Sequence, residues 1–222
     1  MREPVKKEVR RRQYRSAVRA DNAKRTRRAI VAAAGDLFMA KGYAATSLAE
    51  VATAAGVARP TVFAAFGSKP ALLRQVLDEA LAGDDAAVPV AQRPWFQPVW
   101  DASTPSAVLD AYASVCVLIA RRAARLFEAV RRAADDSPDV AQLWQTLQDN
   151  RHAGAKMVLE HALTLGPLAK GLSPKEAIDI LWMFNDPAHY AALVLDRGWT
   201  EDRFRHWLAS MMRQALLGEV GY

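Results

Sequence analysis

Residue types that could catalyse a reaction or bind a metal ion are present in this 222-residue sequence, but they are not grouped. Histidine and aspartate lie three positions apart twice, at Asp149 and His152 and at Asp186 and His189, which would bring each pair to one face of a helix. The four histidines are otherwise scattered, so neither pair has a third ligand at a useful spacing. The sequence also has no phosphate-binding glycine-rich loop, Gly-x-Ser-x-Gly elbow or Cys-x-x-Cys motif. We therefore expect no catalytic residue, no metal site and no cofactor.

A second set of polar side chains is suited to recognition and stands at the start of a short predicted helix. Arg59 can donate two hydrogen bonds to one guanine, and Thr61 can hydrogen-bond a base edge. The preceding segment begins with Ser47 and Glu50 at the spacing of a capping box, and it ends at Gly56, which can adopt the left-handed backbone of a tight turn. The whole stretch has the form of a helix-turn-helix, whose second helix enters the major groove of DNA. Helical hairpins with other functions also contain such turns.

Helical periodicity dominates the rest of the chain, and few residues favour strands. Helices are expected to begin at about residues 30, 47, 58, 68, 106, 138, 173 and 200. We expect a bend near Arg121 and a break at Pro187, which lacks an amide hydrogen. Residues 83–105 combine four prolines with three large aromatic residues, which indicates a loop packed onto the body of the protein. The sequence thus predicts an all-α fold, with three short helices followed by about six longer ones.

The positive charge of the chain is concentrated at one end. Residues 1–28 contain twelve Lys or Arg and three acidic residues, residues 29–82 are balanced, and residues 83–222 contain fourteen basic and seventeen acidic residues. The excess that gives a net charge of +6 therefore lies in a basic N-terminal arm, which is typical of a segment that binds a polyanion. A solvated disordered tail or a remnant of a targeting signal would have a similar composition.

The composition excludes several other classes of protein. The single cysteine, Cys116, excludes an intramolecular disulfide framework and favours a reducing compartment. Apolar runs such as residues 115–120 are far shorter than the about 20 residues of a membrane span. The charged N-terminus lacks the apolar stretch of a secretory signal. We therefore expect a cytoplasmic protein that does not contact membranes.

The order and spacing of residues 26–77 are more specific than the helix-turn-helix alone. The positions that carry the pattern are Ala29, Phe38, Gly42, Tyr43, Thr46, Ser47, Ala55, Gly56, Val57, Thr61, Val62, Phe63, Phe66, Ser68, Lys69 and Leu72. In this arrangement the sequence resembles the N-terminal domain of TetR-family transcriptional regulators. The resemblance implies a homodimer, with an N-terminal three-helix DNA-binding domain and a C-terminal helical domain for ligand binding and dimerisation. We accordingly expect a basic arm at 1–25, the helix-turn-helix domain at 26–82 and the C-terminal domain at 83–222.

The resemblance also implies which side chains contact DNA. Thr46 and Ser47 would approach a phosphate at the start of the second helix, and Lys69 would bind a phosphate at the start of the fourth. This sequence has Ala58 where the family usually has a Ser or Thr cap, and Phe63 where it usually has Tyr. Direct base readout would then depend chiefly on Arg59 and Thr61. The residues expected at the DNA are Arg27, Arg28, Thr46, Ser47, Arg59, Pro60, Thr61, Phe63 and Lys69.

The C-terminal domain contains candidates for two further roles. The apolar stripe of the predicted helix at 138–165 is interrupted by Arg151 or Asn150, Gly154 and His161. The polar side chains among them either find local partners or orient a small, mostly apolar ligand. The expected ligand-binding residues are Tyr112, Cys116, Phe127, Trp144, Arg151, Met157 and His161. In TetR-like proteins the last two helices pair between subunits. This pairing implies dimer contacts through Trp182, Phe204, Trp207 and Met211.

The sequence therefore favours a homodimeric DNA-binding regulator rather than an enzyme. Its expected partners are an inverted repeat in double-stranded DNA, a second copy of the chain and a small-molecule effector that releases a repressor from its operator. One alternative is a small-molecule-binding protein or enzyme in which the helix-turn-helix is accessory. The other is a DNA binder that responds to no ligand.

Overall fold

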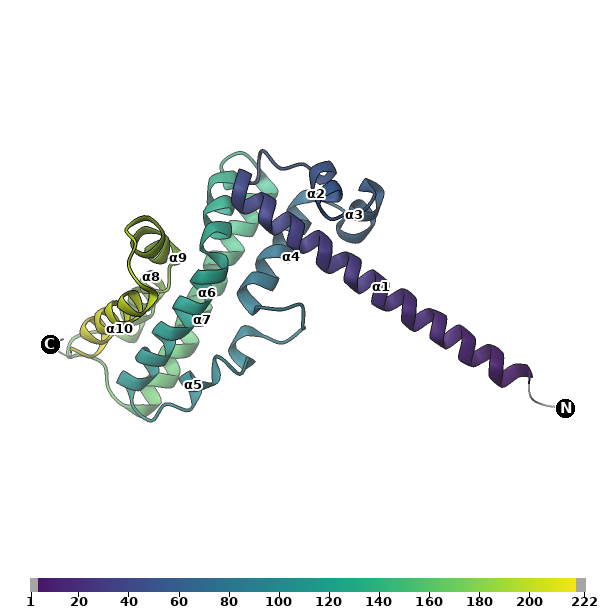
Figure 1. The fold of residues 1–222 in the computed structure, drawn as a ribbon. Helices are drawn as coiled ribbons and strands as arrows, with labels where there is room; N and C mark the ends of the chain where they lie inside the picture. The colour runs from purple at the N-terminus through teal and green to yellow at the C-terminus, as the bar shows by residue number, and fades with distance from the viewer. Residues whose placement is uncertain (1–3, 219–222) are drawn as a thin grey trace. The chain divides into compact units, whose positions relative to one another are not determined.

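The computed structural model describes residues 4–218, and the side chains of residues 19–218. Every regular element in this range is helical, so the predicted all-α fold is confirmed (Figure 1). The chain divides into two compact units, Met1–Val76 and Leu77–Tyr222. None of the helices in the described part of the chain combines the length and the apolar character that crossing a bilayer requires.

The N-terminal unit is built from four helices, the last of which continues into the second unit. These are α1 (Pro4–Lys41), α2 (Leu48–Ala54), α3 (Arg59–Phe66) and α4 (Lys69–Ala82). The stripe predicted from residue 30 onward forms the packed part of α1, where Ile30, Ala34 and Phe38 are fully buried. The helix begins much earlier than this stripe, however, so the basic arm is a helical continuation of α1 in the residues that the structure describes.

Local sequence signals account for the turn between α2 and α3. The Glu50 amide donates to Ser47 Oγ at 3.2 Å, and the Ser47 amide donates to Glu50 Oε2 at 2.9 Å, which confirms the predicted capping box. Gly56 has a φ of +66°, the left-handed conformation that the reversal of the chain requires. At the start of α3 the N-cap residue is Ala58, which has no side chain to cap the helix.

The C-terminal unit is larger and contains two long helices. Its elements are η1 (Val90–Gln92), α5 (Gln97–Trp100), α6 (Pro105–Ala134), α7 (Pro138–Leu165), α8 (Pro174–Phe184), α9 (Pro187–Tyr190), the π-helical η2 (Ala191–Asp196) and α10 (Glu201–Leu217). The bend predicted near Arg121 does not interrupt α6. The break predicted at Pro187 is confirmed, because α8 ends before this residue and α9 begins with it.

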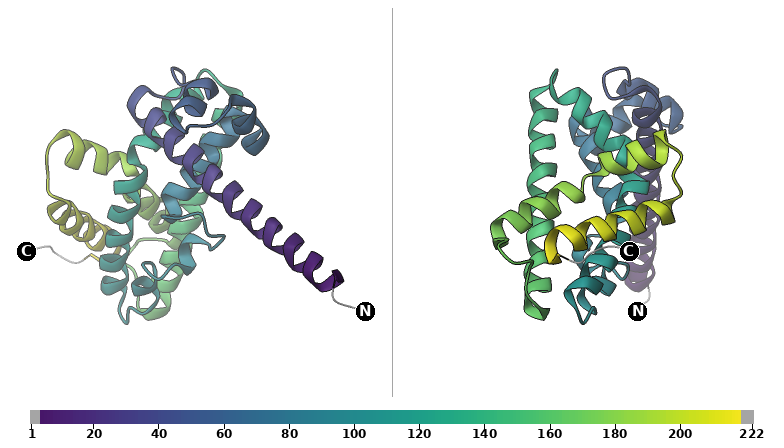
Figure 2. Two further views of the ribbon diagram at one scale, coloured as in Figure 1. Left: turned by 45° about the vertical axis from the view of Figure 1, so that its right-hand side comes forward. Right: turned by 90° about the vertical axis from the view of Figure 1, so that its left-hand side faces the viewer.

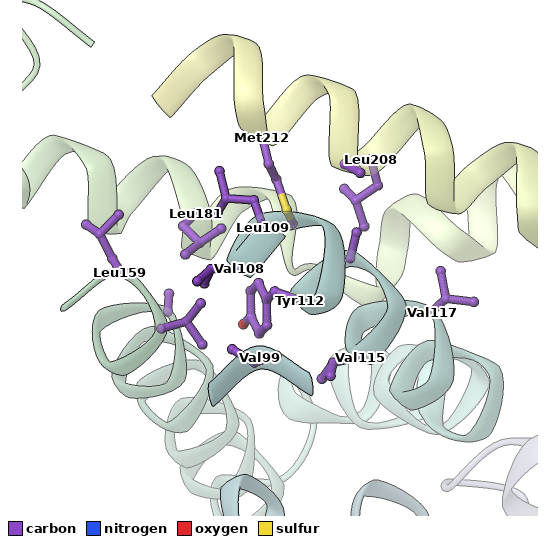
Figure 3. Packing of buried hydrophobic residues seen from close by; sticks show 14 of the residues in the cluster. Val99, Val108, Leu109, Tyr112, Val115, Val117, Leu159, Leu181, Leu208 and Met212 are labelled. Atoms are coloured by element: carbon purple, nitrogen blue, oxygen red, sulfur yellow. The ribbon is translucent and has the colours of Figure 1, made fainter. Parts of the chain in front are cut away.

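Helix α6 lies at the centre of the C-terminal core and packs against both α7 and α10 (Figures 2 and 3). Leu109 and Tyr112 of α6 meet Leu181 of α8 and Leu208 and Met212 of α10, and all five side chains are buried. Burying side chains of this size contributes about 1.5–3 kcal/mol each, so these contacts contribute substantially to the stability of the unit.

Residues 83–105 are packed onto the C-terminal unit, as the aromatic residues predicted. Arg93 is only 5% exposed. Its guanidinium donates to Asp84 Oδ2 at 2.6 Å, to the Ala86 carbonyl at 2.8 Å and to the Val88 carbonyl at 3.1 Å. A buried charge is tolerated only when it is paired in this way, so Arg93 holds the irregular segment in one conformation.

The uncapped start of α3 gives a prediction about stability. Replacing Ala58 with Ser supplies a hydroxyl that can accept an orphan amide of the first turn, so Ala58→Ser should stabilise the N-terminal unit by about 1 kcal/mol. Urea unfolding followed by circular dichroism measures the change. The matched control is Ala64→Ser on the exposed face of the same helix, which should be neutral or slightly destabilising. Equal effects of the two variants would contradict the capping argument.

Candidate nucleic-acid interface

Helix α3 is anchored by one side and presents the other to solvent. Val62 is fully buried, whereas Phe63 is 63% exposed. Arg59, Pro60 and Thr61 are exposed as well, so the first turn of the helix is open to a ligand. A guanidinium, a hydroxyl and an aromatic ring on one short helix can together contact a guanine edge, a second base edge and a thymine methyl group. The structure therefore brings four of the predicted DNA-contact residues to one surface.

The exposed Ser47 lies at the N-terminus of α2, where backbone amides favour an anion. Its cap partner Glu50 would repel a phosphate if it stood alone. Lys41 Nζ, however, contacts Glu50 Oε1 at 2.8 Å. The hydrogen bond from Lys41, followed by those from Ser47, lowers the pKa of Glu50 to about 2. The acid is thus ionised and paired at neutral pH, which limits its repulsion of a phosphate at this helix start.

Lys69, the first residue of α4, lies close to the loop that precedes α2. Its Nζ donates to the Ala44 carbonyl at 3.4 Å and stands 4.1 Å from the centre of the Tyr43 ring. Partial burial lowers the pKa of Lys69 below its ordinary value. The ammonium is therefore held on the same side as the N-terminus of α2, a position that suits the predicted phosphate contact.

Thr46 does not have the predicted role. Its side chain is 2% exposed, and its hydroxyl donates to the Gly42 carbonyl at 2.9 Å, with the Leu37 carbonyl 3.3 Å away. Because the hydroxyl is turned toward the C-terminus of α1, it cannot contact a phosphate. The side chain instead ties the start of α2 to the end of α1.

Arg27, predicted to contact DNA, is half-buried and has partners within its own unit, whereas its neighbour Arg28 is exposed. The Arg27 guanidinium donates to the Ala65 carbonyl at 3.1 Å and to Gln75 Oε1 at 2.7 Å, and it stands 4.3 Å from the centre of the Phe66 ring. It thereby fastens α1 to the end of α3 and to α4. The sequence carried a signal for this, because position 27 falls on the same helical stripe as the buried residues at 30, 31, 34 and 38.

In the C-terminal unit the structure brings together three of the predicted ligand-binding residues. Arg151 Nε donates to Asn185 Oδ1 at 3.1 Å, and Asn185 Nδ2 donates to the Tyr112 hydroxyl at 2.9 Å. Cys116 is on α6, four residues after Tyr112, and burial raises its pKa to about 12. Burial also raises the pKa of Tyr112 and lowers that of Arg151. Asn185 was missed by sequence reasoning, since it follows an apolar helix and belongs to no motif.

The guanidinium of Arg151 has further partners among the described residues. It donates to the Trp182 carbonyl at 2.9 Å and to Gln148 Oε1 at 2.5 Å, and it stands 3.2 Å from Asp186 Oδ2. Of the two alternatives predicted from the sequence, these contacts agree with the one in which Arg151 finds local partners. Arg151 ties α7 to the end of α8.

The other predicted ligand-binding residues lie apart from this group. Phe127 and Trp144 contact each other edge-on, with ring centres 6.3 Å apart. The rings of His161 and Trp100 contact each other edge-on, with ring centres 5.3 Å apart. His161 Nε2 is buried without a partner in the described part of the chain. Met157 is 37% exposed. The seven predicted residues thus do not form a single group.

Of the four side chains predicted to make dimer contacts, three lie at the surface of the C-terminal unit and one lies in its core. Trp182, Trp207 and Met211 are half-buried, so each leaves apolar surface uncovered. Phe204 is 2% exposed and packs edge-on against Tyr190, with ring centres 5.7 Å apart. A side chain in the core of its own unit has no surface to offer a partner, so Phe204 does not fill the predicted role.

The two histidines considered with aspartate in the sequence each have another ring partner in the structure. His152 Nε2 lies 3.1 Å from Asp179 Oδ1, on α8, and His189 Nε2 lies 3.0 Å from the Met183 carbonyl. Within the described residues no three His, Cys, Asp or Glu side chains are grouped as metal ligands would be.

Comparison with known proteins finds a family model that matches this part of the chain. Residues 30–76, which include all of α2 and α3, match the family described as bacterial regulatory proteins, tetR family. No curated protein matches the chain.

Three solved structures illustrate the similarity of the whole fold. NalD from Pseudomonas aeruginosa, the secondary repressor of the MexAB-OprM multidrug efflux pump, is 20% identical with a TM-score of 0.67, over 90% of this chain and 100% of NalD. SmeT in complex with triclosan is 21% identical with a TM-score of 0.66, over 86% and 91% of the two chains. The regulator FadR from Bacillus subtilis in complex with stearoyl-CoA is 16% identical with a TM-score of 0.67, over 83% and 96%.

Proposed function

Because its N-terminal domain makes this chain a member of the TetR family of bacterial regulatory proteins, we propose that it is a transcriptional repressor that binds DNA as a homodimer. The observation that carries the proposal is the exposed first turn of α3, where Arg59, Thr61 and Phe63 stand on a helix-turn-helix. Arg59 donates to a guanine in the major groove, while Ser47 and Lys69 contact phosphates. The phosphate contacts position the helix, and Arg59 supplies most of the sequence preference.

A homodimer is the assembly that an inverted-repeat site requires. Two copies related by a two-fold axis place their α3 helices in successive major grooves, about 34 Å apart or somewhat more. Apolar side chains on α8 and α10 support an interface there, since Trp182, Trp207 and Met211 are half-buried and Met183 is 50% exposed. Large aromatic residues and methionines of this kind are enriched in protein interfaces.

The repressor is released by a small, mostly apolar molecule that binds in the C-terminal unit. Structures of the same fold hold triclosan in SmeT and stearoyl-CoA in FadR, which supports a ligand of this character. His161 Nε2, which is buried without a partner in the described part of the chain, supplies a polar atom that can orient it. The ligand must bind one conformation of the dimer more tightly than the other, because equal affinity for both would shift nothing. Helix α4 connects the two units and carries the change.

Selection of DNA from a random pool tests the proposed base readout. We expect the purified chain to select an inverted repeat. Arg59→Ala should relax the preference at one base pair of each half-site, at a cost of about 1–3 kcal/mol, because the bidentate contact to guanine is lost. Lys69→Gln should instead weaken all sequences by a similar factor. Arg74→Ala, an exposed arginine on α4, is the control. If Arg59→Ala selected the same sequence as the wild type with the same sharpness, the assignment of Arg59 would be wrong.

Sedimentation of surface variants tests the proposed interface. Trp207→Glu and Met211→Glu place a charge where the dimer buries apolar surface, so both should shift the chain toward monomer and weaken operator binding. Met39→Glu is the matched control, since Met39 is 39% exposed on α1 of the other unit. A dimer that survives both changes at the dissociation constant of the wild type would place the interface elsewhere.

Titration of effectors tests the proposed release. Triclosan and a long-chain acyl-CoA are the first probes. A compound that weakens the operator complex about 100-fold needs a coupling free energy of about 2.7 kcal/mol, and operator DNA must then weaken binding of that compound by the same factor. Tryptophan fluorescence with and without operator measures both affinities. Equal affinities would exclude that compound as an effector.

A further inference from the structure

The N-terminal part of α1 is an extended helix that the N-terminal unit does not cover. The helix spans 38 residues, and its buried positions begin at Ile30. Every residue from 19 to 25 is exposed. Figures 1 and 2 show the same helix continuing past α2 and α3 without meeting another element of its unit. At 1.5 Å per residue, the stretch from residue 4 to residue 28 is about 37 Å long, close to one turn of B-form DNA.

This stretch carries an unusual density of positive charge. Residues 1–28 contain twelve basic and three acidic residues, whereas the rest of the chain is slightly acidic. Basic residues stand four positions apart at 6 and 10, at 7 and 11, and at 11 and 15. Such like-charge spacings destabilise a helix in water, and a helix without tertiary packing is marginal in any case. A partner with closely spaced negative charges would remove the repulsion and stabilise the helix.

The direction in which the extension leaves the unit is fixed beside the proposed recognition helix. Arg27 donates to the Ala65 carbonyl in the last turn of α3 and to Gln75 of α4, and it stacks on the ring of Phe66. These contacts lie at the junction between the packed and the exposed parts of α1. When α3 enters the major groove, the extension must therefore start close to the same duplex.

The composition of the extension favours nucleic acid over a lipid surface. A helix that binds an anionic membrane needs a broad apolar face with Trp, Phe or Leu. Residues 1–28 contain none of these three residue types, and their larger apolar residues are Met1, three valines and Tyr14. A phosphate backbone requires only positive charge, at one negative charge per about 1.7 Å of duplex.

We propose that residues 4–28 of α1 form a second DNA-binding element, which lies along the phosphate backbone of the duplex that flanks the half-site read by α3. This inference rests on the proposed function, because it presumes a duplex held by α3. The element adds affinity without base preference, since it contacts phosphates alone. The operator complex should therefore cover more DNA than the two half-sites.

The test uses the full chain and two charge-matched variants. Arg10→Gln, Arg11→Gln and Arg12→Gln together neutralise part of the extension. Arg125→Gln, Lys170→Gln and Arg197→Gln remove the same charge from exposed positions of the C-terminal unit. Affinity is measured from 50 to 200 mM salt, on the selected duplex alone and on the same duplex with ten additional base pairs on each side.

The arm variant should lose affinity for the long duplex, and its slope of log affinity against log salt should be shallower by up to about 2.7 per chain. Between 50 and 200 mM salt, this difference makes the wild type lose up to about 40-fold more affinity per arm than the arm variant. The control variant should keep the slope of the wild type. On the short duplex the arm variant and the control should differ little. Helicity of the wild-type chain should also rise when the long duplex is added.

Failure of this inference is distinguishable from failure of the proposed function. If the wild type selects no duplex from a random pool, the proposed function and this inference both fall. If it selects a duplex but the arm and control variants have equal slopes on the long form, only the second DNA-binding element is overturned. The proposal would also be overturned, in favour of a membrane surface, by one further result. In that result the arm variant no longer binds vesicles of phosphatidylglycerol and phosphatidylcholine that the wild type binds, while its salt slope on DNA equals that of the wild type.

Discussion

The position of α3 is the constraint on which the N-terminal unit depends. A helix of eight residues is too short to be stable alone in water, so it exists only through its contacts with the rest of the unit. Val62 supplies the buried anchor, and the guanidinium of Arg27 holds the last turn through the Ala65 carbonyl and the Phe66 ring. Because the contacts lie on one side and toward the C-terminal end, the first turn remains exposed. The contacts that hold the helix and the side chains that are open to a ligand thus lie toward opposite ends of the same short helix.

Two other arginines also hold neighbouring segments of the chain together through several hydrogen bonds. Arg93 donates to two backbone carbonyls and to Asp84 in the segment before α5, and Arg151 joins α7 to the end of α8 through Asn185 and the Trp182 carbonyl. The guanidinium is suited to this because it presents five donors in a fixed plane. Removing one of these side chains would leave several acceptors without a partner, which costs more than the loss of one hydrogen bond.

The sequence could predict those features that depend on neighbouring residues. The capping box of Ser47 and Glu50, the turn at Gly56 and the break at Pro187 each require only a short stretch of chain. The all-α fold and the packed stripe of α1 follow from periodicity in the same way. The exposed face of α3 was also predicted, because the family pattern covers it without gaps.

Features that depend on which side chains meet in space were not predictable in this way. Thr46 turns its hydroxyl inward because two carbonyls at the end of α1 lie within reach, and no spacing in the sequence encodes that. Phe204 and Trp207 both fall on the apolar stripe of α10, yet only Phe204 points fully into the core. Asn185 gains its place in the C-terminal unit from Tyr112 and Arg151, which are 73 and 34 positions away in the sequence.

The environment of Cys116 has a practical consequence for studying this protein. It is the only cysteine in the chain, and burial raises its pKa to about 12. At pH 8 the folded protein therefore holds this side chain mostly as the neutral thiol, whereas an unfolded cysteine with a pKa of about 8.5 is partly ionised. Alkylating reagents attack the thiolate, so the rate of labelling follows the opening of the helices around α6. Cys116 therefore offers a single chemical reporter of local unfolding in the C-terminal unit.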